Sequence, residues 1–194
     1  NIARTTLGMA PLLSDEGFTS SDKPLLIALG RTITGAPQFS DALVHLIFNE
    51  ETPTLGICYG MQLIAQHAAK GYYNAVKPGE CGEYGKNTLE ITHPIGVLRG
   101  LGKHEQVWMS HGDQVVLLPP GFQRLDPVRE EYKSGNYYPI KALMHNVKPI
   151  FGLQFHPEVN DTLCGRQILK NFAEICCADQ NWNSQTVFKQ ITDG

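Results

Sequence analysis

The sequence predicts a single α/β domain in which a mostly parallel central sheet is flanked by helices. Two apolar runs, residues 25–29 and 150–155, have the length and continuous hydrophobicity of buried parallel strands. A third run, residues 54–57, leads directly into residues 61–69, which have a helix-like composition. Residues 165–176 carry apolar side chains at helical spacing and can therefore cover one face of the sheet. Strands that alternate with helices in this way are typical of α/β domains.

Length and composition narrow the functional classes. The 194 residues suit one domain with a substantial core, and 16 Lys and Arg against 19 Asp and Glu leave a formal charge of −3. This balance and the absence of basic clusters argue against nucleic acid as a partner. No apolar run approaches the roughly 20 residues that span a bilayer, and no signal-peptide pattern opens the chain. We therefore predict a cytoplasmic protein without a membrane partner.

The cysteines indicate a reducing compartment. They are odd in number and irregularly spaced, with no C-x-x-C pair that would hold zinc. Five of the seven histidines also lack the spacing of metal ligands, so we predict no metal site. These histidines are His45, His67, His93, His104 and His145.

The segments between these main elements also allow predictions of their local structure. Ser40 can cap a helix that follows it, and the glycine-rich residues 77–85 predict a loop. Residues 88–92 and 106–110 alternate apolar and polar side chains, which predicts strands that are partly antiparallel. Residues 126–138 are charged and have few apolar anchors, so we expect them to be exposed.

A cysteine stands at the corner between a predicted strand and helix. Gly56 and Gly60 lie two residues either side of Cys58, and glycines permit the sharp turn on which a nucleophile projects from the top of a sheet. The helix N-terminus would favour the thiolate form of Cys58, which attacks carbonyl carbon. The alternative is structural, since most cysteines outside disulfides are simply small buried residues.

A histidine and a glutamate follow another predicted strand. His156 lies at the C-terminal end of this strand, where the chemistry of open α/β sheets gathers, and Pro157 fixes the backbone between it and Glu158. His156 could act as the base for Cys58, with the Glu158 carboxylate orienting the imidazole. A surface turn histidine is the alternative for His156 alone, but the predicted turn at Cys58 favours a catalytic triad.

Further residues are candidates for lining this site. The amide of Tyr59, at the helix start, could stabilise a negatively charged oxygen, and Gly30, after a strand expected to neighbour that of Cys58, is a candidate second donor. An ordinary loop glycine is the alternative for Gly30. Ser110, His111 and Asp113 follow a predicted strand and could line a polar pocket, although a simple turn would explain them equally well.

Two motifs together carry a family resemblance. GICYGMQ at residues 56–62 and QFHPEV at residues 154–159 closely resemble the class I, or triad, glutamine amidotransferases. Within this family, EYG at 83–85, VWMSHGD at 107–113, LPPGF at 118–122 and residues 165–172 are similar to the amidotransferase domains of GMP synthases. The likeness extends from about Pro53 to the end of the chain.

The resemblance implies a reaction and a partner. Glutamine would be hydrolysed to glutamate and ammonia through a thioester on Cys58, with His156 as base and acid and Glu158 orienting it. The ammonia would pass to an ATP-pyrophosphatase (synthetase) domain or subunit, which uses ATP and magnesium to aminate xanthosine monophosphate to GMP. No cofactor is implied for the amidotransferase part itself. The positions that contact glutamine in similar domains are occupied here by Gln62, Ser110, His111 and Asp113.

The resemblance also suggests a domain organisation. We expect residues 1–180 to form the glutaminase domain, and residues 181–194 to form a tail or linker toward a synthetase domain that is absent from this chain. The sequence leaves open whether the chain is a fragment of a bifunctional enzyme or a separate subunit, and how much precedes Asn1.

The first fifty residues depart from the family pattern. The Asp-Phe-Gly-Ser-Gln segment and the Gly-Gly-Pro loop that supplies a second oxyanion donor are not present as such, although residues 26–30 lie near the place of the loop. This departure favours one alternative, a domain without catalysis, and three alternatives in all stay open. They are an amidotransferase that feeds ammonia to chorismate, carboxyphosphate or UTP chemistry, a non-catalytic amidotransferase-like binding domain, and a cysteine peptidase or general hydrolase.

Overall fold

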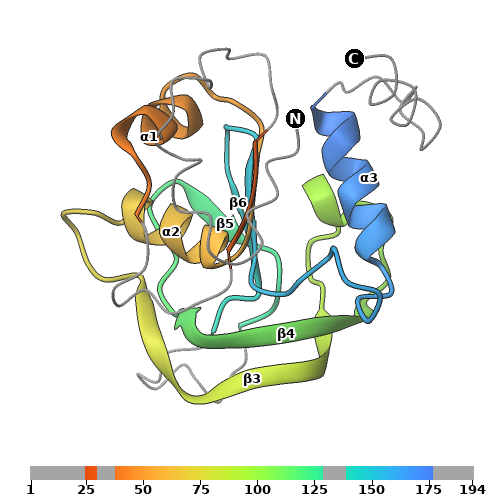
Figure 1. Ribbon diagram of the computed structural model, residues 1–194. Helices are drawn as coiled ribbons and strands as arrows, with labels where there is room; N and C mark the ends of the chain where they lie inside the picture. Colours follow the sequence, from red (N-terminus) through yellow and green to blue (C-terminus); the bar gives the residue numbers. More distant parts are fainter. Residues whose placement is uncertain (1–24, 30–37, 129–138, 177–194) are drawn as a thin grey trace, which may run out of the picture.

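The computed structural model describes residues 25–29, 38–128 and 139–176 of the chain (Figure 1). The elements follow one another in the order β1 (Leu25–Leu29), α1 (Asp41–Phe48), β2 (Thr54–Cys58), α2 (Tyr59–Ala68), β3 (Val76–Glu90), η2 (Gly96–Leu98), β4 (His104–Val115), β5 (Phe122–Arg124), β6 (Ala142–His145), β7 (Ile150–Leu153) and α3 (Gly165–Ile175). The prediction of an α/β domain is confirmed. No helix within the described ranges is long and apolar enough to cross a bilayer.

The central sheet is mixed rather than mostly parallel. Its five strands lie in the order β1-β2-β7-β6-β5. The pairs β1–β2 and β2–β7 are parallel, as predicted, whereas β6 and β5 are both added antiparallel. The expectation of a mostly parallel sheet was wrong for these two strands. The connection between β6 and β7, residues 146–149, is too short for the crossover that parallel neighbours need, so the chain reverses direction there.

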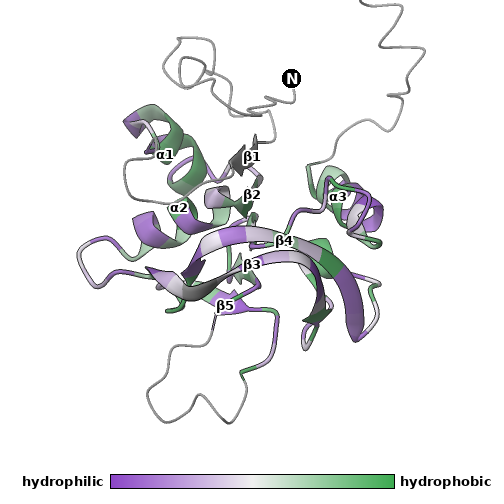
Figure 2. Ribbon diagram, turned by 60° about the horizontal axis from the view of Figure 1, so that its bottom comes forward, coloured by the Kyte–Doolittle hydropathy of each residue, from purple (hydrophilic) through white to green (hydrophobic). Residues whose placement is uncertain are grey.

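A separate two-stranded sheet forms a long curved ribbon across one end of the central sheet (Figures 1 and 2). Its strands, β3 and β4, pair antiparallel, with a register shift between Pro78 and Glu83. The glycine-rich residues 77–85 are therefore not a loop but the first part of β3. Likewise, residues 110–113 do not follow a strand, because β4 continues through them to Val115.

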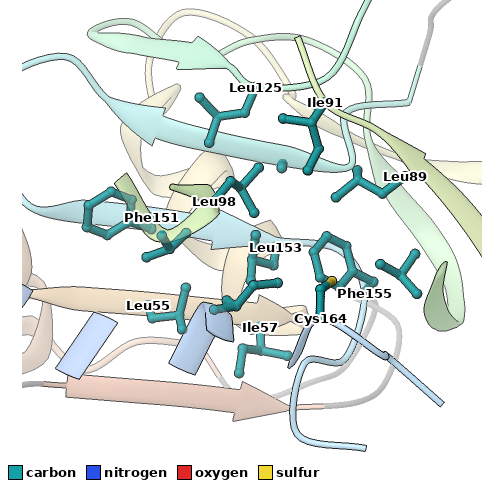
Figure 3. Close-up of a cluster of buried hydrophobic side chains, with 14 of the residues drawn as sticks. Leu55, Ile57, Leu89, Ile91, Leu98, Leu125, Phe151, Leu153, Phe155 and Cys164 are labelled. Carbon is teal, nitrogen blue, oxygen red and sulfur yellow. The ribbon is translucent and has the colours of Figure 1, made fainter. Parts of the chain in front are cut away.

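Helices cover both faces of the central sheet (Figure 1). On one face, α1 and α2 enclose a core that includes Ile47, Met61 and Ile64. On the other face, side chains from the sheet meet those of β3, η2 and α3 in a second core, part of which is drawn in Figure 3. The apolar spacing of residues 165–176 correctly predicted that α3 packs on the sheet, since Ile168 and Phe172 belong to this core.

Local signals explain where the first helix begins. The hydroxyl of Ser40 accepts a hydrogen bond from the amide of Leu43 at 3.3 Å, and Asp41 lies in the first turn of α1. The predicted cap at Ser40 is thus confirmed.

Candidate active site

Cys58 forms a sharp corner between β2 and α2. Its backbone has φ 53° and ψ −110°, and it is the residue that caps the N-terminus of α2. A positive φ is unfavourable for a residue with a side chain, by about 1–3 kcal/mol, and such strain is concentrated at functional sites. The predicted strand, turn and helix with a cysteine at the corner are therefore present. Tyr59, the first residue of α2, places its amide at the helix N-terminus beside Cys58.

Two polar groups approach the sulfur of Cys58. The thiol donates to the backbone oxygen of Ser110 over 3.7 Å, and the side-chain amide of Gln154 donates to the sulfur over 3.9 Å. Gln154 also accepts a hydrogen bond at 3.3 Å from Gln62, whose amide nitrogen in turn lies 2.7 Å from the backbone oxygen of Asp113. A buried chain of polar groups thus connects β4, α2 and the end of β7 to the sulfur.

His156 and Glu158 form a close pair after β7. The imidazole Nδ1 lies 2.7 Å from Oε1 of Glu158, while the buried Nε2 has no hydrogen-bond partner. Burial lowers the pKa of His156, but the proximity of Cys58 and the hydrogen bond to Glu158 raise it, to about 10 on balance. The charged form of the imidazole is therefore favoured between the sulfur of Cys58 and the carboxylate of Glu158.

A cavity of about 410 Å³ connects these groups. Its lining consists of Cys58, Gln62, Tyr84, Trp108, Ser110, His111, Gly112, Asp113, His156 and Val159. The fold thus brings together Cys58 and His156, nearly 100 residues apart in the chain, with all four candidate substrate-binding residues. Glu158 contributes no surface to this cavity and instead contacts the imidazole. Gly30 lies outside the described residues, although Leu29, which precedes it, is paired in register with Cys58.

His111, on β4, lies next to the acidic side chain of Glu83 on β3. Its Nδ1 lies 3.0 Å from the backbone oxygen of Asp113, and its Nε2 lies 3.4 Å from Oε2 of Glu83. The proximity of His111 lowers the pKa of the Glu83 carboxyl, against the opposing effect of burial. The pair joins β3 to β4 next to the cavity, which His111 lines.

Sequence reasoning missed several residues of this site. Tyr84, Trp108 and Val159 line the cavity, and Gln154, although part of a recognised motif, received no role. The alternating pattern of residues 106–110 predicted a strand, but it could not show that this strand passes beside Cys58. Within the ranges 25–29, 38–128 and 139–176, no cluster of three or more His, Cys, Asp or Glu side chains is placed to hold a metal ion.

Comparison with known proteins identifies the family. The family model of class-I glutamine amidotransferases matches residues 27–176, which is most of the chain. The corner at Cys58 and the cavity described above both lie within this match. The chain belongs to the class-I glutamine amidotransferase family.

Individual relatives give a more specific likeness than the family model does. The chain is 41% identical over 142 residues to a GMP synthase [glutamine-hydrolyzing] of Candida albicans, and 37% identical over 176 residues to that of Schizosaccharomyces pombe. These matches cover 73% and 84% of this chain but only 25% and 31% of the relatives, so the chain spans less than a third of their length.

A solved structure supports the same grouping. A protein from Thermoplasma acidophilum, described as a candidate GMP synthase subunit, is 30% identical and superposes with a TM-score of 0.57. The match covers 77% of this chain and 65% of that protein. The resemblance to GMP synthase amidotransferase domains inferred from the motifs is thereby confirmed.

Proposed function

We propose that this chain is the glutaminase part of a GMP synthase, hydrolysing glutamine to glutamate and ammonia through a thioester on Cys58. The observation that carries the proposal is the cavity lined by both Cys58 and His156, with Glu158 bonded to the far side of the imidazole. Family membership supports glutamine as the substrate.

In the first half of the reaction the sulfur of Cys58 attacks the side-chain amide carbon of glutamine. The electron pair of the carbonyl moves onto oxygen, giving a tetrahedral intermediate. When this intermediate collapses, the C–N bond breaks and the imidazolium of His156 gives its proton to the departing nitrogen, so ammonia leaves. A thioester of glutamate remains on Cys58.

In the second half the neutral His156 takes a proton from water, which attacks the thioester carbon. The C–S bond then breaks, glutamate leaves, and the thiolate and imidazolium are restored. Glu158 stabilises the imidazolium and fixes the ring so that Nε2 faces the reacting atoms. The amide of Tyr59 stabilises the oxygen of each tetrahedral intermediate. Gly30 remains our candidate for the second donor.

Four residues would bind the substrate. Gln62, Ser110, His111 and Asp113 line the cavity. Their amide, hydroxyl, imidazole and carboxylate groups suit the charged α-amino and α-carboxyl groups of glutamine. The buried Oε1 of Gln62 has no hydrogen-bond partner and is free to accept one.

The ammonia acceptor follows from the relatives. Because they are GMP synthases of more than three times the matched length, we infer that a synthetase domain or subunit receives the ammonia and uses ATP and magnesium to aminate xanthosine monophosphate. We propose residues 1–180 as the glutaminase domain and residues 181–194 as a linker toward that partner. The amidotransferase part needs no cofactor in this mechanism, and the reaction would occur in the cytoplasm.

The first experiment is trapping with 6-diazo-5-oxo-norleucine, an electrophile that mimics glutamine, followed by intact mass measurement and peptide mapping. We expect one adduct, on Cys58, that glutamine blocks and Cys58→Ala abolishes. Cys164→Ala is the matched control, because burial raises the pKa of the Cys164 thiol to about 11 and keeps it unreactive. Absence of any adduct, with or without a synthetase partner, would instead support the non-catalytic alternative.

A second experiment identifies the acceptor. Glutaminase activity of the chain mixed with a GMP synthase synthetase part should rise when ATP, magnesium and xanthosine monophosphate are added together. Stimulation by chorismate, carboxyphosphate or UTP systems instead would assign the domain to another amidotransferase. Cleavage of peptides without glutamine hydrolysis would indicate a peptidase.

A further inference from the structure

The edge of β4 that faces away from β3 contacts both halves of the candidate active site. Gln106, Trp108 and Ser110 are two residues apart, so their backbone groups point to the same edge of the strand. The oxygen of Ser110 accepts from the thiol of Cys58 at 3.7 Å, and the oxygen of Trp108 accepts from the amide of His156 at 3.0 Å. One strand edge therefore positions the sulfur and the imidazole relative to each other.

A threonine completes the attachment of His156 to this edge. The buried hydroxyl of Thr162 accepts from the amide of Trp108 at 2.9 Å and donates to the backbone oxygen of His156 at 2.5 Å. The amide and the oxygen of Trp108 are thus both bonded to the segment that carries the imidazole.

Neighbouring contacts hold the same segment against β4. The amide of Leu163 donates to the oxygen of Gln106 at 3.2 Å, and the side chain of Gln106 donates to the oxygen of Asp161 at 2.9 Å. Lys86, on the partner strand β3, lies 3.4 Å from the carboxylate of Asp161. These contacts fix the far end of the segment, whereas the hydroxyl of Thr162 bonds to the backbone of His156 itself.

We propose that Thr162 is a positioning residue: its hydroxyl links the backbone of His156 to Trp108 and so holds the imidazole at the distance from Cys58 that β4 sets. The inference rests on the proposed roles of Cys58 and His156. Thr162 does not line the cavity and touches none of the reacting atoms. It acts only through the segment between β7 and α3, which carries His156. Because proton transfer is sensitive to displacements of about 1 Å, loss of this link should impair catalysis more than substrate binding.

The test compares variants that separate the hydroxyl from the rest of the side chain. Thr162→Val keeps the shape and removes the hydroxyl, Thr162→Ala removes it without adding a methyl group to a buried site, and Thr162→Ser restores it. Thr54→Val is the matched control, because the hydroxyl of Thr54 is equally buried and donates to the oxygen of Thr52 at 2.7 Å, at the opposite end of β2 from Cys58.

Three readouts are measured on each variant. They are the kcat and KM of glutamine hydrolysis, the pH dependence of Cys58 alkylation by iodoacetamide, and the titration of the His156 ring by NMR. We expect Thr162→Val and Thr162→Ala to lower kcat about 10- to 100-fold with KM within about threefold. Their alkylation at neutral pH should slow and the His156 midpoint should fall toward 6.5. Thr162→Ser and Thr54→Val should keep the wild-type kcat within about threefold and its pH profile.

Two results would overturn the proposal. One is a folded Thr162→Val or Thr162→Ala variant with wild-type kcat and pH profile, and the other is a Thr162→Ser variant as impaired as Thr162→Val. If the wild-type chain hydrolyses no glutamine, with or without a synthetase partner, the proposed function fails by itself. The positioning role is then decided by alkylation and the His156 titration, neither of which needs glutamine.

Discussion

Gly56 and Gly152 are register partners on the parallel strands β2 and β7, and α2 packs directly on this pair. A Cβ atom at Gly56 would lie 2.7 Å from the backbone carbon of Gly60, and one at Gly152 would lie 2.7 Å from Cγ of Met61. The two absent side chains allow the helix that follows Cys58 to lie close to the sheet.

The two glycines should differ in their response to alanine. Gly152→Ala meets flexible side chains that can move, so we expect a loss of about 1 kcal/mol in the free energy of unfolding, whereas Gly56→Ala meets the backbone of the turn and should cost about 2–3 kcal/mol. Urea denaturation measures both losses. Trapping by 6-diazo-5-oxo-norleucine should slow only in Gly56→Ala, and equal effects of the two substitutions would contradict this account.

Glu158→Gln tests the carboxylate behind the imidazole. This substitution removes a charge that raises the pKa of His156, so its NMR titration midpoint should fall from about 10. We expect kcat for glutamine hydrolysis to fall about 100-fold or more, because the imidazolium loses its stabilising partner. Glu174→Gln, on α3 and paired with Arg99 instead of a histidine, is the control and should leave both quantities unchanged.

The pH dependence of stability should report the same group. Folding raises the pKa of His156 from 6.5 to about 10, so its contribution to stability is fully present below pH 6.5 and is lost as the pH rises through about 10. The difference in the free energy of unfolding between wild type and His156→Gln should therefore shrink across this range. Chemical denaturation at several pH values measures the difference, and a gap that widens with pH would refute the assignment.

Gln154→Glu tests the amide next to the sulfur. It replaces the group that donates to Cys58 over 3.9 Å by a carboxylate, which cannot donate and repels a thiolate. We expect alkylation of Cys58 at neutral pH to slow about tenfold or more, since one pKa unit of lost stabilisation corresponds to that factor. The control is Gln66→Glu on α2, where the side-chain amide bonds to Asn74 at the surface.

The hydrogen bonds that join α3 to residues 97–99 should affect the free energy of unfolding and not catalysis. The buried amide of Asn171 donates to the backbone oxygens of Val97 and Arg99 at 2.9 and 2.8 Å, whereas Glu174 pairs with the exposed Arg99 side chain. Asn171→Ala should cost about 2–3 kcal/mol, because it leaves buried acceptors unpaired. Glu174→Ala should cost less than about 1 kcal/mol, since exposed ion pairs contribute little. Thermal unfolding of the two variants checks the order.

Local patterns predicted the elements that local chemistry controls. The apolar run at β2, the glycines around Cys58 and the cap at Ser40 specify the strand, the turn and the helix start from residues a few positions apart. The motif at residues 154–159 likewise indicated His156 and Glu158, whose side chains lie 2.7 Å apart.

Long-range contacts settled how these pieces meet. The short connection at residues 146–149 accounts for the antiparallel pair of β6 and β7. No local signal showed that β5 pairs with β6, or that residues 77–85 extend a strand instead of forming a loop, because strand pairing depends on partners distant in the chain. The same holds for Trp108, Gln154 and Thr162, whose bonds around the site join residues far apart in the chain. The order of the residues thus specified which groups carry the chemistry, whereas the packing of distant elements set the distances between those groups.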